Sequence, residues 1–381
     1  MQGKYLAASP YNLVRLLLGE RYPSDNDSEN VYTRAAAYLE DWIKKGILVQ
    51  DSAPGLYAYF QDFQVPDSGE RLTRKGFIGI GKVEDYSAGI VHRHEQTLTG
   101  PKKDRLELLR KTRAHFGQIF MLYPDQESAV DRLLDEAAAR TPILDVTDDY
   151  QVRNRVWAIT DPATIAGIQQ LMEPKKLLIA DGHHRYETAL AYRNENRGVP
   201  GAEYAMMTFV SMHSPGLRIL GAHRVLRDME KFNAADFFQQ AVKGGWSVAA
   251  LPSLEALKHR MEVHDPKMVH IGAVVHDEWR LMQRVRKPDE LDVSVLHHDI
   301  IGGLMGITEE AVREEKHIQY VRGIDAAAAE VEKNGAQIAF LLEPTPIDEM
   351  ARIAFAGGVM PQKSTDFYPK MLSGLTIYRV S

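Results

Sequence analysis

The sequence predicts an α+β fold, with mixed sheets and packed helices and an inserted or peripheral α/β subdomain. Apolar runs and alternating segments typical of strands are interleaved with amphipathic segments typical of helices. Several strand-like segments follow one another in hairpin-like stretches, which is untypical of a doubly wound parallel sheet. The 381 residues suffice for two or three domains, or for one large unit with an insertion.

The expected elements follow these patterns in chain order. We expect strands where residues are continuously apolar or alternate, at 11–18, 56–63, 76–83, 117–123, 152–159, 176–180 and 204–210. We expect helices where apolar residues recur every three or four positions, at 31–45, 106–112, 127–140 and from residue 183 onward.

A segment without polar motifs then separates the two motif-rich parts of the chain. Residues 232–263 are predicted to be mostly helical, and residues 267–285 to hold two short strands. This change predicts an N-terminal part over 1–228 and an inserted or peripheral subdomain over 229–288. Residues 289–381 are then expected to form a C-terminal part that completes the core.

The composition excludes several classes of protein. A net charge of −6 and a pI near 6.2 argue against nucleic-acid binding through bulk charge. The absence of cysteine excludes disulfides, thiolate metal sites and a cysteine nucleophile. No signal-peptide pattern is visible, and no apolar run approaches the ~20 residues of a membrane helix. We therefore expect a cytoplasmic protein without a membrane partner, and no pattern indicates its oligomeric state.

The densest group of polar residues is I-A-D-G-H-H-R-Y-E-T-A-L at 179–190. An apolar run precedes it and helical spacing follows it, so this cluster lies where a strand ends and a helix begins. Asp181 and Gly182 are typical of a tight turn. Free N–H groups and the helix dipole favour an anion there, and two histidines and an arginine add donors. The pattern predicts a phosphate or carboxylate site, although a D-G turn is also a common connector.

Two further clusters carry similar side chains. Residues 89–109 combine His92, His94 and Glu95 at a strand end with a charged helix start, and such groups serve in general base catalysis or Mg²⁺ binding. Residues 356–374 join Gly-Gly, Lys-Ser-Thr and a second lysine, which can hold a phosphate but lack the P-loop spacing. The alternatives are a solvated charge run that caps a helix and a proline-rich loop over a core.

Metal-ligand patterns are weak in this chain. His183 and Glu187 are four residues apart and would share a helix face, but no H-E-x-x-H or similar spacing occurs. A structural zinc is therefore not expected. Mg²⁺ bound together with a nucleotide is the better expectation.

Three motifs, taken in order, resemble the family known as domain of unknown function 1015 (DUF1015) over nearly the whole chain. They are H-E-x-T with K-x-D-R-L at 94–106, A-D-G-H-H-R-Y-E-T-A-L at 180–190, and M-P-x-K-S-T-x-F-Y-P-K at 360–370. The family brings no established activity. Its members usually carry P-P-Y-D-V ahead of a segment like S-P-Y-N-L-V-R-L, and this chain starts almost at that second segment. We expect that about one strand or more is missing, which would impair the site if that strand lines it.

The D-G-H-H-R-Y loop is also similar to the G-x-H-R-Y type loop of the ParB/sulfiredoxin superfamily, which receives nucleotide phosphates. Members of that superfamily include free-serine kinases and nucleotide-driven DNA clamps. The resemblance implies a ParB/sulfiredoxin-like core, while the lack of cysteine excludes sulfiredoxin chemistry. The kinase members use a glutamate as base and a loop aspartate near the phosphates, which implies Glu95 and Asp181 for those roles.

These observations predict a nucleotide- or phosphate-binding protein that acts as a small-molecule phosphotransferase of the serine-kinase type. ATP or ADP would be the nucleotide, and Mg²⁺ held by Asp181 the metal. The predicted catalytic residues are Glu95, Asp181 and His184. The predicted substrate- or phosphate-binding residues are His94, Thr97, Lys102, Arg105, Gly182, His183, Arg185, Glu187, His223, Arg224, Lys363, Ser364, Thr365 and Lys370.

Two other functions stay open. One is a metal-assisted phosphatase or hydrolase, and the other is a ligand-sensing or DNA-associated regulator, against which the acidic pI counts. In each case we expect the three motifs to converge on one pocket, because each places polar groups at the end of an element.

Overall fold

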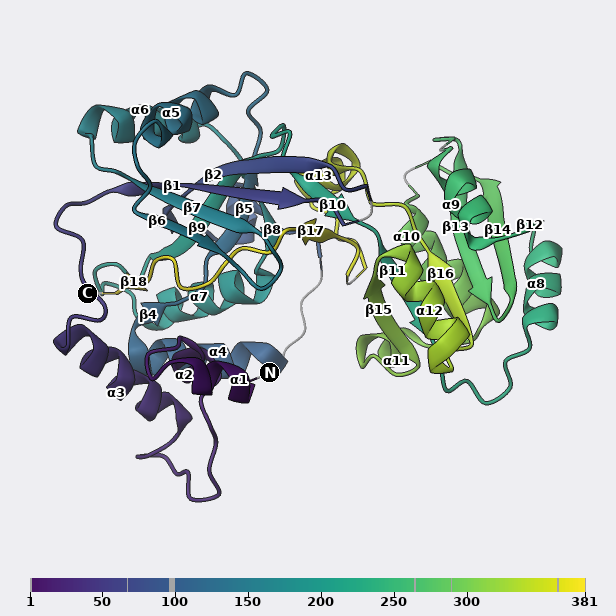
Figure 1. Cartoon of the computed structure of the whole chain (residues 1–381), viewed down its shortest axis with the longest axis horizontal. Helices are drawn as coiled ribbons and strands as arrows, with labels where there is room; N and C mark the ends of the chain where they lie inside the picture. Colours follow the sequence, from purple (N-terminus) through teal and green to yellow (C-terminus); the bar gives the residue numbers. More distant parts are fainter. Residues whose placement is uncertain are drawn as a thin grey trace.

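The computed structural model describes residues 2–66, 68–95, 100–263, 265–288, 290–361 and 363–380, and for residues 100–102 it describes only the backbone. Two lobes are visible, each built around its own sheet (Figure 1). The first lobe holds both ends of the described chain. Within the described residues, no helix is long and apolar enough to span a membrane.

An eight-stranded mixed sheet forms the first lobe. Its order is β3-β8-β5-β9-β2-β1-β7-β6, and the pairs β3–β8 and β5–β9 are parallel while the others are antiparallel. The strands are β1 (Leu56–Gln64), β2 (Arg71–Lys82), β3 (Val91–His92), β5 (Ile119–Tyr123), β6 (Leu144–Thr147), β7 (Arg153–Ile159), β8 (Leu177–Asp181) and β9 (Tyr204–Ser211). The expected α+β class with mixed sheets is confirmed.

Seven helices and two short strand pairs accompany this sheet in the described part of the chain. The helices are α1 (Gln2–Ala8), α2 (Val14–Leu17), α3 (Val31–Lys44), α4 (Gly100–Thr112), α5 (Ala129–Ala138), α6 (Pro162–Met172) and α7 (His183–Glu195), and a 3-10 turn spans Tyr86–Ala88. β4 (Ala114–His115) pairs with β18 (Tyr378–Arg379), and β10 (Arg218–Leu220) pairs with β17 (Asp366–Tyr368). These two pairs return the C-terminal segment to the first lobe.

A separate antiparallel sheet forms the second lobe, in the order β12-β14-β13-β16-β11-β15. Its strands are β11 (Ala222–Leu226), β12 (Ser247–Leu251), β13 (Met268–Val275), β14 (Glu278–Val285), β15 (Ile318–Arg322) and β16 (Ile338–Leu341). Its helices are α8 (Ala234–Lys243), α9 (Leu254–Glu262), α10 (Asp292–Val295), the π-helix Leu296–Leu304, α11 (Glu309–Arg313) and α12 (Ile324–Asn334).

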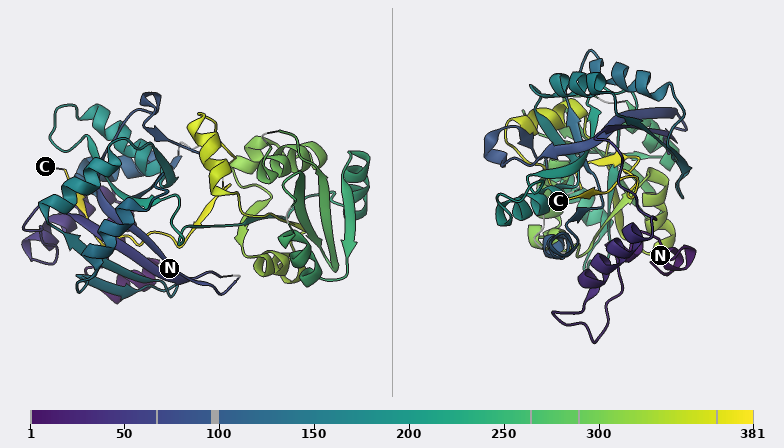
Figure 2. Two further views of the ribbon diagram at one scale, coloured as in Figure 1. Left: turned by 90° about the horizontal axis from the view of Figure 1, so that it is seen from above. Right: turned by 90° about the vertical axis from the view of Figure 1, so that its left-hand side faces the viewer.

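The lobes share one apolar core around α13 (Ile347–Phe355), the yellow helix that lies between them in Figure 2. One cluster of buried side chains runs from Phe120 and Leu178 of the first sheet to Leu226 and Phe340 of the second. Met350, Ala351 and Ala354 of α13 belong to the same cluster. Continuous apolar burial of this kind holds the two lobes in a defined relative position.

The predicted domain boundaries differ from the observed lobes. The second sheet begins at β11, before residue 229, and it includes β15 and β16, which lie after residue 288. Only the segment after β16 returns to the first lobe. Local sequence patterns assigned residues 289–341 to the C-terminal part. In the structure β11 pairs with β15 and β16, which lie about one hundred residues later, and a pairing over that separation cannot be recognised from local sequence.

Several predicted elements also differ in type or length. Residues 11–18 hold the short helix α2 instead of a strand, because Leu16 packs on α3 beside Leu39 and Trp42. The segment predicted as mostly helical contains the strand β12, which pairs with β14 at the sheet edge. In addition, β2 begins at Arg71 and α4 at Gly100, both earlier than expected.

Candidate functional site

The three sequence motifs contact one another at the edge of the first sheet. The Thr365 hydroxyl lies 2.7 Å from Nε2 of His94, and Oε1 of Glu95 accepts from the amides of Ser364 (3.1 Å) and Thr365 (3.4 Å). The Met360 amide donates to the carbonyl of His94 (2.7 Å). The His94 ring meets the His183 ring edge-on at 4.8 Å between centroids. Residues separated by up to 271 positions therefore form one cluster.

A glycine turn connects the strand and the helix of the second motif. β8 ends at Asp181, Gly182 adopts a φ of +98°, and α7 starts at His183. An added Cβ at Gly182 would lie 2.8 Å from Nε of Arg185, and one at Gly117 would lie 3.2 Å from Nη1 of the same side chain. The positive φ at Gly182 favours glycine there, whereas a Cβ at Gly117 would require the Arg185 guanidinium to shift slightly.

Positive charge surrounds Asp181. The Arg185 guanidinium pairs with the Asp181 carboxylate and donates to the Gln118 carbonyl, while Nζ of Lys370 lies 3.9 Å from Oδ1 of Asp181. Burial lowers the pKa of Arg185, Asp181 opposes that change, and the nearby positive charge of Arg105 adds to it. Arg185 and Lys370 thus lie beside the Asp181 carboxylate, and Arg105 lies near Arg185, at the N-terminus of a 13-residue helix, where the dipole also favours negative charge.

Two buried histidines of the site are held neutral. His94 is fully buried, and burial lowers its pKa, while Glu95 partly opposes the shift. His183 is buried as well. Burial first, and then the neighbouring ionisable side chains of His94, His184, Arg93 and Arg185, hold its pKa well below the ordinary value. Nε2 of His183 has no hydrogen-bond partner in the described part of the structure. It is therefore available to a group that enters the site.

The other predicted residues of these motifs lie in different settings. His184 and Glu187 are partly buried on α7, and Glu187 lies 3.8 Å from Arg93. Lys363 is exposed with a φ of +56°, and the Ser364 hydroxyl donates to the Pro361 carbonyl (2.5 Å). Thr97 lies outside the described residues, and for Lys102 only the backbone, within α4, is described.

Three residues expected to bind substrate directly are instead engaged by the protein. His94 uses both ring nitrogens, on Thr365 and on the Ile179 carbonyl (2.7 Å). His223 is buried, accepts from the Leu342 amide (3.2 Å), and burial lowers its pKa to about 4.

Arg224 is buried in the same region. It donates to the Lys363 carbonyl (3.0 Å) and to His297 (3.1 Å), and burial lowers its pKa to about 10. Arg224 therefore connects the second lobe to the third motif, whereas His223 forms its hydrogen bond within the second lobe. The sequence pattern suggested the end of a strand, but both residues lie within the buried strand β11, and the sequence does not show which strands are buried.

Sequence reasoning missed Arg74, a fully buried cation beneath the site. It donates to Oε1 of Gln61 and to the carbonyl of Pro369 (2.5 Å), and its guanidinium lies 4.9 Å from the Phe120 ring centroid. Burial lowers its pKa to about 10, while Tyr59 and Asp181 oppose that shift. The available signal was alternation, because Arg74 shares a strand face with the buried Ile78.

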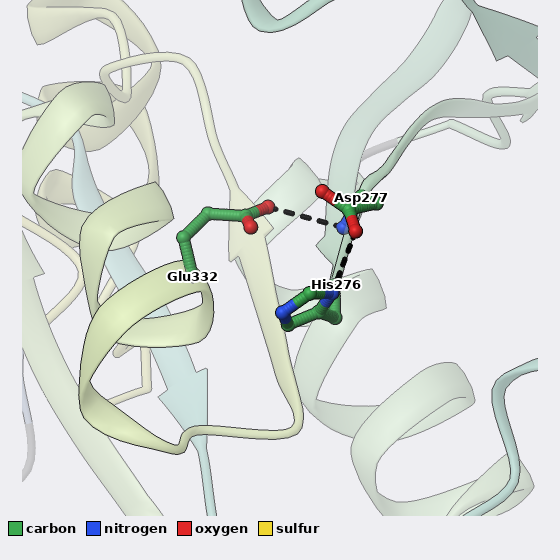
Figure 3. Close-up of side chains that lie close together, drawn as sticks. All are labelled: His276, Asp277 and Glu332. Atoms are coloured by element: carbon green, nitrogen blue, oxygen red, sulfur yellow. Dashed lines mark hydrogen bonds and ion pairs between the residues drawn. The ribbon is translucent and has the colours of Figure 1, made fainter.

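A possible metal-binding group lies elsewhere, on the second lobe (Figure 3). Of the described residues, His276, Asp277 and Glu332 offer three ligand atoms within 4.8 Å of one another. His276 Nδ1 lies 3.0 Å from Asp277, whose amide donates to Glu332 (3.3 Å). His276 and Asp277 are exposed, and Asp181 belongs to no such group among the residues described. Mg²⁺ at Asp181 would therefore need further ligands from phosphate or water.

Comparisons with known proteins identify the family. Residues 1–301 match the family described as "Protein of unknown function (DUF1015)", so the chain belongs to it. No curated protein matches the sequence significantly.

Solved structures show a distant likeness only. A free serine kinase in complex with AMP is 13% identical, with a TM-score of 0.40 over 76% of this chain and 86% of that one. SbnI from Staphylococcus aureus, truncated at its C-terminus, is 11% identical, with a TM-score of 0.39 over 77% and 85%. A conserved hypothetical protein from Pyrococcus furiosus is 12% identical, with a TM-score of 0.38 over 76% and 90%.

Proposed function

We propose that this member of the DUF1015 family binds a nucleotide by its phosphates and transfers a phosphoryl group to a small hydroxyl-bearing acceptor, as a serine kinase does. The observation that carries the proposal is the N-terminus of α7, where Arg185 and Lys370 lie beside Asp181 and Arg105 lies near Arg185. Phosphoryl transfer needs mainly positioning and neutralisation of charge, and this arrangement supplies both.

The contacts suggest a role for each group. Arg185, His183 and His184 would hold phosphate, since cationic and N–H donors at a helix start suit its oxygens. Asp181 would hold Mg²⁺ or the acceptor, and Mg²⁺ would neutralise phosphate charge. Glu95 would be the base that takes the acceptor's proton, with Oε1 oriented by two backbone amides. ATP or ADP is the proposed donor.

Remaining candidates would act around this centre. Lys102, Arg105, Lys363 and Lys370 would attract the anion, while Ser364, Thr97 and Glu187 would contact the acceptor or nucleotide. The ParB/sulfiredoxin-like core, which the loop resemblance implies, stays part of this proposal.

Paired binding and turnover measurements test it. The purified chain would be screened for a rise in melting temperature with ATP or ADP, each with and without Mg²⁺, and then assayed for transfer to serine-like acceptors. Asp181→Asn and Glu95→Gln should each lower turnover at least about 100-fold, because each keeps volume and removes a charge that acts in the reaction. Asp145→Asn and Glu195→Gln are matched controls, since both carboxylates pair with an arginine on the exposed surface.

The outcomes separate the proposed function from its alternatives. Phosphate release from a phosphoester without any acceptor would favour the metal-assisted phosphatase or hydrolase. Nucleotide or DNA binding without turnover would favour a regulator. If the two variants instead lose many degrees of melting temperature, the carboxylates are structural parts of the turn and loop, and the catalytic assignment fails.

A further inference from the structure

We infer that Thr365 is a nucleophile that takes the phosphoryl group from the nucleotide before the acceptor does, with His94 as its base. The inference rests on the proposed function, because the phosphoryl donor is the nucleotide proposed above. It adds a covalent phosphothreonine step to that reaction.

The hydrogen bonds of His94 define its tautomer. Nδ1 lies 2.7 Å from the Ile179 carbonyl, and a carbonyl oxygen can only accept, so Nδ1 carries a proton. In the neutral ring Nε2 then keeps a lone pair, and the Thr365 hydroxyl at 2.7 Å donates to it. A hydroxyl, a base within hydrogen-bond reach and a third group that orients the base form the arrangement typical of an activated nucleophile.

Burial keeps this base in its working form. The His94 ring is fully buried, and the resulting desolvation disfavours its protonated form. A neutral imidazole at neutral pH can accept the hydroxyl proton. Nε2 of His94 lies 2.7 Å from the Thr365 hydroxyl and 3.7 Å from Oε1 of Glu95, so the hydroxyl is the group within hydrogen-bond reach and supplies the proton.

Two neighbouring groups compete with this assignment, and the distances decide between them. Oε1 of Glu95 lies 3.3 Å from the Thr365 hydroxyl, but the hydroxyl has one proton and the His94 nitrogen is nearer. Oε1 of Glu95 already accepts two backbone amides. The Ser364 hydroxyl is bound to the Pro361 carbonyl, so it has no base at hand. Thr365 is therefore the activated hydroxyl of the K-S-T segment.

The surroundings suit an incoming phosphate. Thr365 is only partly buried, and Lys363, two residues earlier, is exposed. His183 places its unpartnered Nε2 on a ring that touches His94. The Lys363 ammonium, and Nε2 of His183 in the tautomer that carries the proton there, can hold the oxygens of a terminal phosphoryl group near the hydroxyl.

Phosphoryl transfer to Thr365 forms one bond to phosphorus and breaks one. Thr365 Oγ1 bonds to the terminal phosphorus, the bond from that phosphorus to its bridging oxygen breaks, and the electron pair leaves with the shortened nucleotide. The hydroxyl proton moves to Nε2 of His94. When an acceptor hydroxyl attacks the phosphothreonine, its oxygen bonds to phosphorus and its proton passes to Glu95. The bond from phosphorus to Oγ1 of Thr365 breaks, and His94 returns its proton to Oγ1.

The test maps phosphate on the whole 381-residue chain. The wild-type chain is incubated with ATP or ADP and Mg²⁺ without acceptor, quenched in acid, digested and analysed by tandem mass spectrometry. We expect phosphate at Thr365, lost at least tenfold in Thr365→Val and kept at position 365 in Thr365→Ser. Thr147→Val, at an exposed position of β6, is the matched control and should label as the wild type does. His94→Asn should slow labelling about 100-fold while its melting curve reports folding.

Nucleotide binding, measured separately by melting temperature, distinguishes failure of the covalent step from failure of the proposed function. Nucleotide binding and transfer to an acceptor without phosphate at Thr365 would overturn the covalent step and leave the proposed function standing. Phosphate at Ser364 instead would also overturn it. No binding of either nucleotide would overturn both proposals. Because the wild-type map decides, the conclusion does not depend on whether Thr365→Val folds.

Discussion

Two clusters in this molecule combine histidine with carboxylates, and they differ in almost every physical respect. His94 and Glu95 lie where three distant segments meet, and His94 is fully buried. His276, Asp277 and Glu332 lie at a hairpin turn and a helix of the second lobe, where the His276 side chain is 70% exposed. The same residue types therefore occur in a fixed, desolvated network and in a solvated surface group.

The difference shows that the position of a histidine in the fold, and not its residue type alone, decides its protonation state and its reactivity. In the buried cluster each ring nitrogen of His94 has a fixed partner, so the tautomer is defined and the neutral form is favoured. In the exposed cluster water competes for the same groups, and an ion pair there contributes little. A chemical role is therefore easier to argue for the first cluster.

The largest expected effect is acid unfolding driven by buried histidines. Among the described residues, burial lowers the pKa of five histidines, which are His94, His115, His183, His223 and His297. Below about pH 6.5 the unfolded chain binds more protons than the native one, so stability falls as pH falls, by on the order of 1 kcal/mol per pH unit per histidine.

Urea unfolding between pH 7 and 5 measures this slope. His183→Gln should flatten it, whereas His276→Gln should leave it unchanged, since His276 is exposed. A slope that is the same in both variants would show that burial at the site does not set the acid sensitivity.

The next largest effect is the loss of stability when His94 or His276 is replaced by alanine. His94→Ala deletes a fully buried ring and leaves the Ile179 carbonyl without its donor, so we expect a loss of about 3–5 kcal/mol in the free energy of unfolding. His276→Ala should cost less than about 0.5 kcal/mol. Denaturant melts of both variants provide the measurement, and equal losses would contradict the contrast between the clusters.

A glycine pair sharpens the comparison at the turn. Gly182→Ala should cost about 1–3 kcal/mol and weaken phosphate binding, because the φ is +98° and the new Cβ would meet the Arg185 guanidinium. Gly46 also has a positive φ, +68°, but open space around it. Gly46→Ala therefore measures the loss of stability that comes from the positive φ alone. If both variants lose the same stability and phosphate affinity is intact, the guanidinium contact at Gly182 does not matter.

The smallest effect concerns metal at the exposed cluster. We expect Ni²⁺ or Zn²⁺ to shift the melting temperature by less than about 1 °C. His276 and Asp277 are exposed to water and already contact each other, so an ion would have to separate them. Glu332→Gln should leave that response unchanged. A larger shift that disappears in His276→Ala would show instead that the exposed cluster is a metal site.

Local patterns predicted most of the regular elements of the first lobe. The helix at 31–45 is confirmed as α3, whose Ala35, Leu39 and Trp42 face the core, and the strand before Asp181 is confirmed as β8. The glycine turn and the helix start at His183 also followed from residue type, since few residues other than glycine adopt positive φ. Such features depend on neighbours in sequence.

The candidate site was accessible from sequence only as three separate motifs. That His94 donates to Ile179 and accepts from Thr365 depends on pairings over 85 and 271 residues. Burial then reversed the expectation for His223 and Arg224, which bind the protein and not an open ligand site. Arg74 escaped notice because its local sign, alternation with the buried Ile78, counts for little when an arginine is so rarely fully buried.

By itself the sequence determined the α+β class, the family and the chemical inventory of the three motifs, because each depends on composition, periodicity or residue order. Only the tertiary structure decided which strands share a sheet, which of those polar groups are desolvated and which atoms meet. Hydrogen-bond partners and the dielectric environment are properties of chain segments far apart in sequence. For that reason the Thr365–His94 pair appears in the fold and nowhere in the linear pattern.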